Sequence, residues 1–230
     1  MVGAKKTISH SPILLILLVL SLLCNAVLVF QNRQKPATGV LVVGVLDGDT
    51  LVLDGKTKVR LRESDAPEIT NCGGEEAKRY LENMVVGKRV RIDEQVGDVY
   101  GRAIALVYAG DTLINEEMLK KGWSRYHHDV SSKAVVLKKS ADEAKEKNIG
   151  IYGLCQSKVN QENPNCVIKG NIDKNSNARN YYVPGCAQYE FTIVEKDMGE
   201  NWFCTEGDAR EAGFTKAKTC HRAFYCNSID

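Results

Sequence analysis

The sequence predicts an α+β protein with three parts: an apolar N-terminal helix, a closed β-barrel of five short strands with three helices, and a small cysteine-rich module. Three observations support this fold class. Short segments rich in β-branched residues alternate with turn residues in the middle of the chain, and helical patterns follow them. Seven of the eight cysteines lie beyond residue 38. We therefore divide the chain into residues 1–38, 39–155, a linker at 156–165 and a module at 166–230.

The middle part carries five strand patterns and three helix patterns. The expected strands are Val40 to Leu46, Thr50 to Asp54, Thr57 to Arg62, Lys88 to Asp93 and Arg102 to Tyr108. The expected helices are Glu75 to Val86, Asp111 to Lys121 with Asp111 as the cap, and Ser131 to Asn148. Asp54-Gly55 supplies a tight hairpin turn. Five short strands with three helices are typical of an oligonucleotide-binding (OB) fold.

The N-terminal part contains an uncharged stretch from Pro12 to Phe30. Nineteen residues of helix are long enough to cross the apolar core of a bilayer. A cleavable signal peptide is the alternative, but its apolar core is usually shorter and ends in small residues, which this stretch lacks. The pattern favours an uncleaved transmembrane anchor.

The charge balance excludes a strongly basic nucleic-acid-binding surface. The chain has 31 Lys and Arg against 29 Asp and Glu, and residues 39–155 alone have 18 against 19. Any attraction for phosphate must therefore be local or supplied by a bound cation.

Three motifs in the middle part carry candidate chemistry. Asp47-Gly48-Asp49-Thr50 follows the first strand, Arg60 to Glu68 spans the end of the third, and Tyr100-Gly101-Arg102 opens the fifth. The first tetrapeptide alone is more typical of a plain turn. Together, in this order and spacing, the motifs resemble the staphylococcal nuclease (thermonuclease) family over roughly residues 40–155.

The resemblance implies a Ca²⁺ site and a phosphodiesterase that acts on DNA and RNA. Its metal ligands would be the carboxylates of Asp49 and Asp65 and the carbonyl of Ala66, all oxygen donors of the kind that Ca²⁺ prefers. Pro67 restricts Ala66 to an extended conformation, which would present that carbonyl rigidly.

The same resemblance assigns catalytic roles. Glu68 would act as general base toward water, and Arg60 and Arg102 would hold phosphate oxygens through their planar forks of donors. Tyr100 would contact the nucleotide. A single arginine on a strand is more often a solvent-exposed edge residue, and this is the interpretation we give to Arg62 and Arg91.

The cysteines indicate an oxidising compartment, because disulfides persist there. Cys72 follows the Asp65–Glu68 loop and Cys155 ends the middle part, so a bridge between them would tie that end to the loop; two free thiols are the alternative.

The C-terminal module resembles the small module found behind exported thermonuclease domains. It also resembles, distantly, a four-cysteine zinc domain of Ada-type repair proteins, although disulfides suit its long cysteine spacings better. Thr205 is expected to cap a helix there.

These patterns predict a membrane-anchored, extracytoplasmic nuclease, secreted if the N-terminal segment is cleaved. The alternatives are a non-catalytic nucleic-acid-binding or surface-binding module, and a zinc-binding adaptor in which the nuclease is secondary. Retention of all five charged side chains at the motif positions argues against the first alternative.

Overall fold

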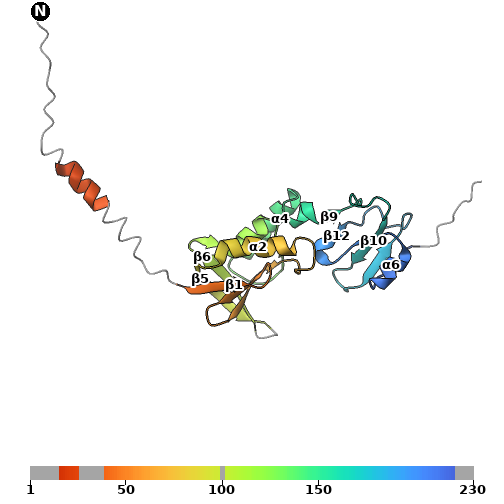
Figure 1. The fold of residues 1–230 in the computed structure, drawn as a ribbon, viewed down its shortest axis with the longest axis horizontal. Coiled ribbons are helices and arrows are strands. Elements are labelled where there is room, and N and C mark those ends of the chain that lie inside the picture. Colours follow the sequence, from red (N-terminus) through yellow and green to blue (C-terminus); the bar gives the residue numbers. More distant parts are fainter. Residues whose placement is uncertain (1–15, 26–38, 99–101, 221–230) are drawn as a thin grey trace, which may run out of the picture. The chain divides into compact units, whose positions relative to one another are not determined.

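The computed structural model describes residues 16–25, 39–98 and 102–220, in two compact units, residues 1–38 and 39–230 (Figure 1). In the first unit, residues 16–25 are helical. Within the described residues, no helix is both long and apolar enough to cross a membrane. The predicted segment from Pro12 to Phe30 extends on both sides beyond the described helix.

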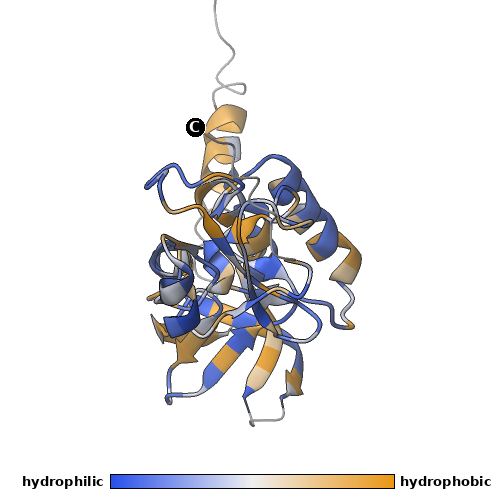
Figure 2. Ribbon diagram, turned by 90° about the vertical axis from the view of Figure 1, so that its right-hand side faces the viewer, coloured by the Kyte–Doolittle hydropathy of each residue, from blue (hydrophilic) through white to orange (hydrophobic). Residues whose placement is uncertain are grey.

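The second unit opens with a sheet whose strands follow the predicted ones closely. The strands are β1 Val40–Val45, β2 Thr50–Leu53, β3 Lys58–Leu61, β5 Arg89–Gly97, β6 Ala103–Ala109 and β7 Thr112–Leu113. Their order is β3-β2-β1-β5-β6-β7, and β3 also pairs in parallel with β6. This extra pairing closes the hydrogen-bonded series of strands β3, β2, β1, β5 and β6 into a ring. Along the strands, hydrophobic and hydrophilic residues alternate (Figure 2), as in a sheet with one buried face.

Four helices accompany the sheet: α2 Gly74–Val85, α3 Ile114–Lys120, α4 Ala134–Glu146 and the single turn α5 Ile151–Leu154. The apolar face of α2 buries Ala77, Leu81 and Val85 in the main core, together with residues of β1, β2, β3 and β6. The α+β prediction is confirmed. The prediction that Asp111 caps α3 is wrong, because Thr112 and Leu113 pair with the end of β6 as a strand and the helix begins only at Ile114.

The polar run Arg62-Glu63-Ser64 is buried, which corrects the expectation that Arg62 is solvent-exposed. Arg62 is 7% exposed, and its guanidinium donates to Asp129 at 2.8 Å and to the carbonyl of Glu94 at 3.1 Å. The amide of Asn115 donates to the carbonyl of Arg62 at 2.8 Å. Most polar groups of this run are therefore hydrogen-bonded inside the protein, while Oε1 of Glu63 is buried without a hydrogen-bond partner among the described residues.

Residues 156–220, which include the expected linker at 156–165 and are called the module from here on, contain a second sheet in the order β13-β10-β11-β14. Its strands are β10 Ile168–Ile172, β11 Arg179–Tyr182, β13 Trp202–Phe203 and β14 Thr215–Lys216, and its helix is α6 Glu206–Glu211. Thr205 caps α6 in a capping box with Asp208, as predicted. The disulfides Cys166–Cys204 and Cys186–Cys220 engage all the module's described cysteines, which argues against the zinc alternative for these four side chains.

The module adjoins the main portion (residues 39–155) through main-chain pairing. Strand β9 Gln156–Ser157 begins directly after Cys155 and pairs with β12 Val194–Glu195, which leads into the short 3₁₀ helix η1 Lys196–Met198. The amide of Lys196 donates to the carbonyl of Cys155 at 2.9 Å. The disulfide Cys72–Cys155 lies at the same end of the main portion, so the first residues of the module are held at a fixed position.

Candidate active site

The turn between β1 and β2 brings the first motif against the second. Asp47 accepts a hydrogen bond from the amide of Asp49 at 3.1 Å, which closes the turn. A Cβ on Gly48 would lie 2.5 Å from the Cβ of Ala66 and 2.6 Å from that of Ala77. Only glycine permits this approach, so Gly48 places Asp49 beside the loop that follows Asp65.

Asp49 is a buried carboxylate, 2% exposed, with three partners. Its Oδ2 accepts from the amide of Ala66 at 2.9 Å, and its Oδ1 accepts from the hydroxyl of Thr50 at 2.9 Å and pairs with Nη1 of Arg60 at 2.8 Å. Burial raises the pKa of Asp49 to about 7, although the charge of Arg60 acts in the opposite direction.

Arg60 joins the two aspartates. It lies opposite Thr50 in the β2–β3 pairing, and its second terminal nitrogen, Nη2, pairs with Asp65. Asp65 stands on the short strand β4 Ser64–Asp65, opposite Arg125 on β8 Arg125–Tyr126. Two carboxylates from separate motifs thus converge on one cationic group.

A cleft of about 540 Å³ collects most of the predicted residues. Arg60, Asp65, Glu68 and Arg102 line it together with the exposed His127 and His128. Glu68 is exposed on the loop after Pro67. The sequence motifs therefore meet in one solvent-accessible place, with an acceptor of protons and two guanidinium groups on its wall.

Arg102 is held beside this cleft by Asp98. The carboxylate of Asp98 accepts from the amide of Arg102 at 2.7 Å and from its Nε at 2.7 Å. This hydrogen bond raises the pKa of Arg102, and the charges of Asp49 and Asp47 add to the effect. The guanidinium is therefore fixed in its charged form. Tyr100, the predicted nucleotide contact, lies outside the described residues.

The donor set fits a hard cation such as Ca²⁺. Asp49 and Asp65 supply carboxylate oxygens on either side of a single positive group, and Ala66 supplies a carbonyl between Asp65 and Pro67. Within the described ranges, no three His, Cys, Asp or Glu side chains cluster closely enough to bind a metal by themselves. Because Ca²⁺ takes six to eight oxygens, water and substrate would complete such a site.

The disulfide Cys72–Cys155 fixes the loop behind this cleft, at the beginning of α2. Gly73 has φ +82°, and a Cβ there would lie 2.7 Å from a methyl group of Ile151. The loop and helix α5 are thus packed too closely for a side chain at this position.

Arg125 and Asp197, which stand in none of the three motifs, also lie beside Asp65, Ala66 and Glu68. Nε of Arg125 donates to Oδ2 of Asp197 at 2.6 Å, and Asn71 donates to the carbonyl of Asp197 at 3.2 Å. The residues come from different parts of the chain, so no local pattern indicated the contact.

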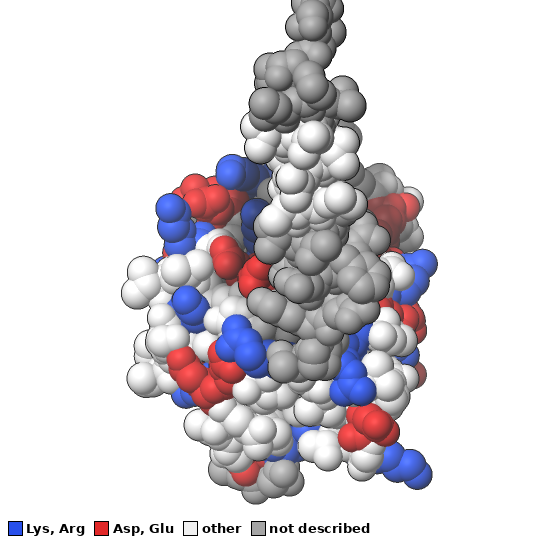
Figure 3. All heavy atoms as spheres, turned by 90° about the vertical axis from the view of Figure 1, so that its left-hand side faces the viewer, with Lys and Arg blue, Asp and Glu red and all other residues white. Residues whose placement is uncertain are grey.

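Charges on one face of the molecule are of both signs. On the face shown in Figure 3, basic and acidic side chains are intermixed over the described atoms. This agrees with the near-neutral composition of the main portion.

Comparison with known proteins identifies relatives over the main portion. The model of the staphylococcal nuclease homologue family matches residues 58–153. An uncharacterized endonuclease of Haemophilus influenzae is 36% identical over 141 residues, which cover 60% of this chain and 78% of that protein. The thermonuclease of Staphylococcus intermedius is 29% identical over 125 residues, covering 49% and 74%.

A staphylococcal-like nuclease of Arabidopsis thaliana is 35% identical over 101 residues, but these cover only 31% of the plant protein and 44% of this chain. The match to the Haemophilus protein covers most of that relative, and it agrees with the family model and with the motifs in the cleft. The chain belongs to the staphylococcal nuclease family of phosphodiester-cleaving enzymes.

Proposed function

We propose that this protein is a Ca²⁺-dependent, extracytoplasmic nuclease that hydrolyses phosphodiester bonds of DNA and RNA. The observation that supports this most directly is the common cleft of Arg60, Asp65, Glu68 and Arg102, with Asp49 bound to Arg60 at its side. A proton acceptor, two planar cationic donors and two converging carboxylates are the parts that hydrolysis of a phosphodiester requires.

The chain's own residues would act as follows. Glu68 accepts a proton from the water that attacks phosphorus, and the new bond from the water oxygen to phosphorus replaces the bond to the leaving oxygen. The leaving oxygen takes the electron pair of the broken bond and gains a proton from solvent. Arg60 and Arg102 donate to the non-bridging oxygens, on which negative charge grows in the transition state. Arg60 would then exchange its present carboxylate partners for phosphate oxygens.

The metal would be held by Asp49, Asp65 and the Ala66 carbonyl. When bound there, Ca²⁺ would supply positive charge that neutralises the phosphate. The family resemblance further suggests cleavage that leaves 3′-phosphate ends. The sharpest test of this assignment separates the metal site from the proton acceptor.

We would measure digestion of DNA and RNA by the full chain with Ca²⁺ and with a chelator, in wild type, Asp49→Asn and Glu68→Gln. Both variants should lose turnover, but only Asp49→Asn should require far more Ca²⁺ for half-maximal activity. Full activity in the chelator would contradict the Ca²⁺ assignment. Wild-type protein that binds DNA without cleaving it at any Ca²⁺ concentration would contradict the nuclease assignment.

The proposed location rests on other features. Three disulfides suit an oxidising compartment, and the uncharged stretch from Pro12 to Phe30 suits an anchor. Protease added to intact cells should release a fragment that contains Trp202. Recovery of the intact, reduced chain from the cytosol would contradict this location.

A further inference from the structure

A largely buried ion cluster, with only Lys174 at its exposed edge, joins the C-terminal module to the main portion beside Asp65. Arg125 is the cross-strand neighbour of Asp65, and it donates to Asp197 at 2.6 Å and to Glu195 at 3.2 Å. Lys174 pairs with the other oxygen of Glu195 at 2.8 Å. Two cations thus meet two anions at this joint, and the module is held in a defined position next to the candidate active site.

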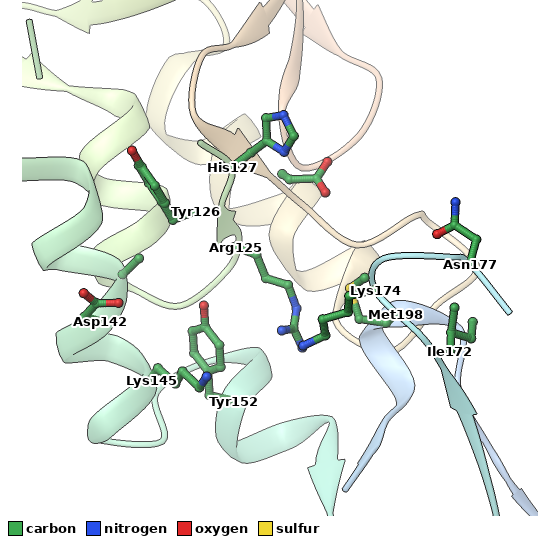
Figure 4. A pocket seen from close by; sticks show the side chains of 12 residues that line it. Arg125, Tyr126, His127, Asp142, Lys145, Tyr152, Ile172, Lys174, Asn177 and Met198 are labelled. Atoms are coloured by element: carbon green, nitrogen blue, oxygen red, sulfur yellow. The ribbon is translucent and has the colours of Figure 1, made fainter. Parts of the chain in front are cut away.

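A groove of about 410 Å³ lies at this joint and is lined by both parts of the chain (Figure 4). His127, Asp142 and Lys145 come from the main portion, and Lys174, Asn177 and Met198 come from the module. Its volume is in the range of about 300–1,000 Å³ that small-molecule sites occupy. The groove therefore has room for a nucleotide-sized group, and the module supplies four of its twelve lining residues.

The groove is continuous with the cleft of the candidate active site. Asp65 and His127 line both, and His127 is exposed at their junction. A ligand chain that is held in the cleft at Arg60 can therefore extend past His127 into the groove without leaving the protein surface.

The charges around the groove leave one cation uncompensated. Asp65 is paired with Arg60, and Asp142 with Lys138 at 2.5 Å, while Arg125 and Lys174 are matched by Asp197 and Glu195. Lys145 is exposed and has no ion pair within 4 Å among the described residues. The same groove is lined by the side-chain amide of Asn177 and the imidazole of His127, so an exposed ammonium and hydrogen-bonding groups share one wall, which suits an anionic polymer with hydrogen-bonding bases.

We propose that this groove binds the part of a single-stranded polynucleotide that continues beyond the scissile phosphodiester. Lys145 holds a backbone phosphate, and the exposed ring of His127 offers a base a flat surface on which to stack. The proposal rests on the nuclease function proposed above. Lys145 and His127 both belong to the main portion, and the module forms the other side of the groove through Lys174, Asn177 and Met198.

The test compares Lys145→Glu with Lys147→Glu in the full chain. Both residues lie at the end of α4, carry the same charge change and are exposed, but only Lys145 lines the groove. We expect Lys145→Glu to raise the ratio of KM for a 20-nucleotide single strand to KM for a dinucleotide about threefold or more at low salt. In Lys147→Glu this ratio should stay at the wild-type value.

A binding measurement keeps the test independent of catalysis. Fluorescence anisotropy of the labelled strand in chelator should show weaker binding for Lys145→Glu than for wild type. The slope of the logarithm of the binding constant against the logarithm of the salt concentration should also be smaller in magnitude by roughly 0.7 or more, which is the contribution of one phosphate contact on a single strand. Equal effects of the two variants, or an equal rise in KM for strand and dinucleotide, would overturn the groove assignment. Absence of cleavage by wild type would instead contradict the nuclease function, and the anisotropy result would still decide the groove.

Discussion

Two arginines in this molecule lie between pairs of carboxylates, and they serve different purposes. Arg60 contacts Asp49 and Asp65 and lines the open cleft. Arg125 contacts Asp197 and Glu195, whose side chains are 1% and 11% exposed, at the joint between the main portion and the module. Burial opposes the charge of Arg125, but the hydrogen bond and charge of Asp197 outweigh that opposition and raise its pKa.

The difference shows that a charge cluster alone does not identify an active site. The cluster at Arg125 has partners for its charges within the protein and fixes the position of one part of the chain against another. The cluster at Arg60 has the same residue types, but Glu68 and Arg102 stand on the same cleft with solvent access. Accessibility to a ligand, together with a proton acceptor, distinguishes the chemical site from the structural one.

The largest expected effect is on catalysis at the first cluster. Glu68→Gln removes the proton acceptor and should lower turnover of DNA about 100- to 10,000-fold. Because Glu68 is exposed, the free energy of unfolding should change by no more than about 0.5 kcal/mol. Turnover assays and denaturant titrations of the same preparations would measure both quantities. A variant with wild-type turnover would remove Glu68 from the mechanism.

The next effect concerns the disulfide behind the cleft. Cys72 and Cys155 are 83 residues apart, so replacing both with alanine should lower the free energy of unfolding by about 4 kcal/mol through the entropy of the unfolded chain. Cys24→Ser is the control, because Cys24 is a free cysteine. Equal stability of the double variant and the control in guanidinium titrations would contradict a stabilising role for the bridge.

Removing the second cluster's arginine should affect stability as well. Arg125→Ala leaves the buried carboxylate of Asp197 without its charge partner, which should cost about 3 kcal/mol of the free energy of unfolding. Arg79→Ala removes an exposed pair with Glu76 and should cost about 0.5 kcal/mol or less. If both variants lose the same stability, the Arg125 cluster does not hold the two parts together.

The smallest effect is a pH dependence within the module. Glu200 is buried and accepts hydrogen bonds from Asn171, Ile172 and Glu195 at 2.7–2.8 Å. Burial raises its pKa from 4.5 to about 7, in spite of the bonds from the amides of Ile172 and Glu195. The protonated form is thus favoured by folding, so this contribution to stability is complete below pH 4.5 and is lost as the pH rises toward 7.

Glu200→Gln cannot titrate, and comparing its stability with that of wild type isolates this contribution. Between pH 4.5 and 7, wild type should lose about 2.5 kcal/mol relative to the variant, given 1.36 kcal/mol per pKa unit and half-titration at each end of this range. Urea titrations at several pH values would give the two curves. Parallel curves would show that Glu200 is ionised throughout this range and that its hydrogen bonds outweigh its burial.

The long elements of the fold could be predicted from the sequence, because their periodicity records which face is buried. The two-residue strands β4, β8, β9 and β12 could not, since each depends on a partner far along the chain. Arg62 illustrates the same limit: its partners Asp129 and Glu94 are 67 and 32 residues away, and nothing local distinguishes it from an exposed arginine.

The residues of the site also fall into two groups, those that could be predicted from the sequence and those that could not. The motif residues Asp49, Arg60, Asp65, Glu68 and Arg102 were found because each stands in a recognisable short pattern, and the fold brings them to one place. The groove residues Lys145 and Asn177 carry no such pattern, and they become neighbours only when the module is docked.

The pairing of β9 with β12 also restricts how the length of this chain can change. Cys155 is fixed by its disulfide, and the next two residues already form a strand, so one inserted residue there would shift the register and turn side chains to the opposite face. Residues 161–165, a few positions further on, are all exposed and lie outside any strand. Insertions and deletions should therefore accumulate at 161–165, while the distance from Cys155 to Ser157 stays constant.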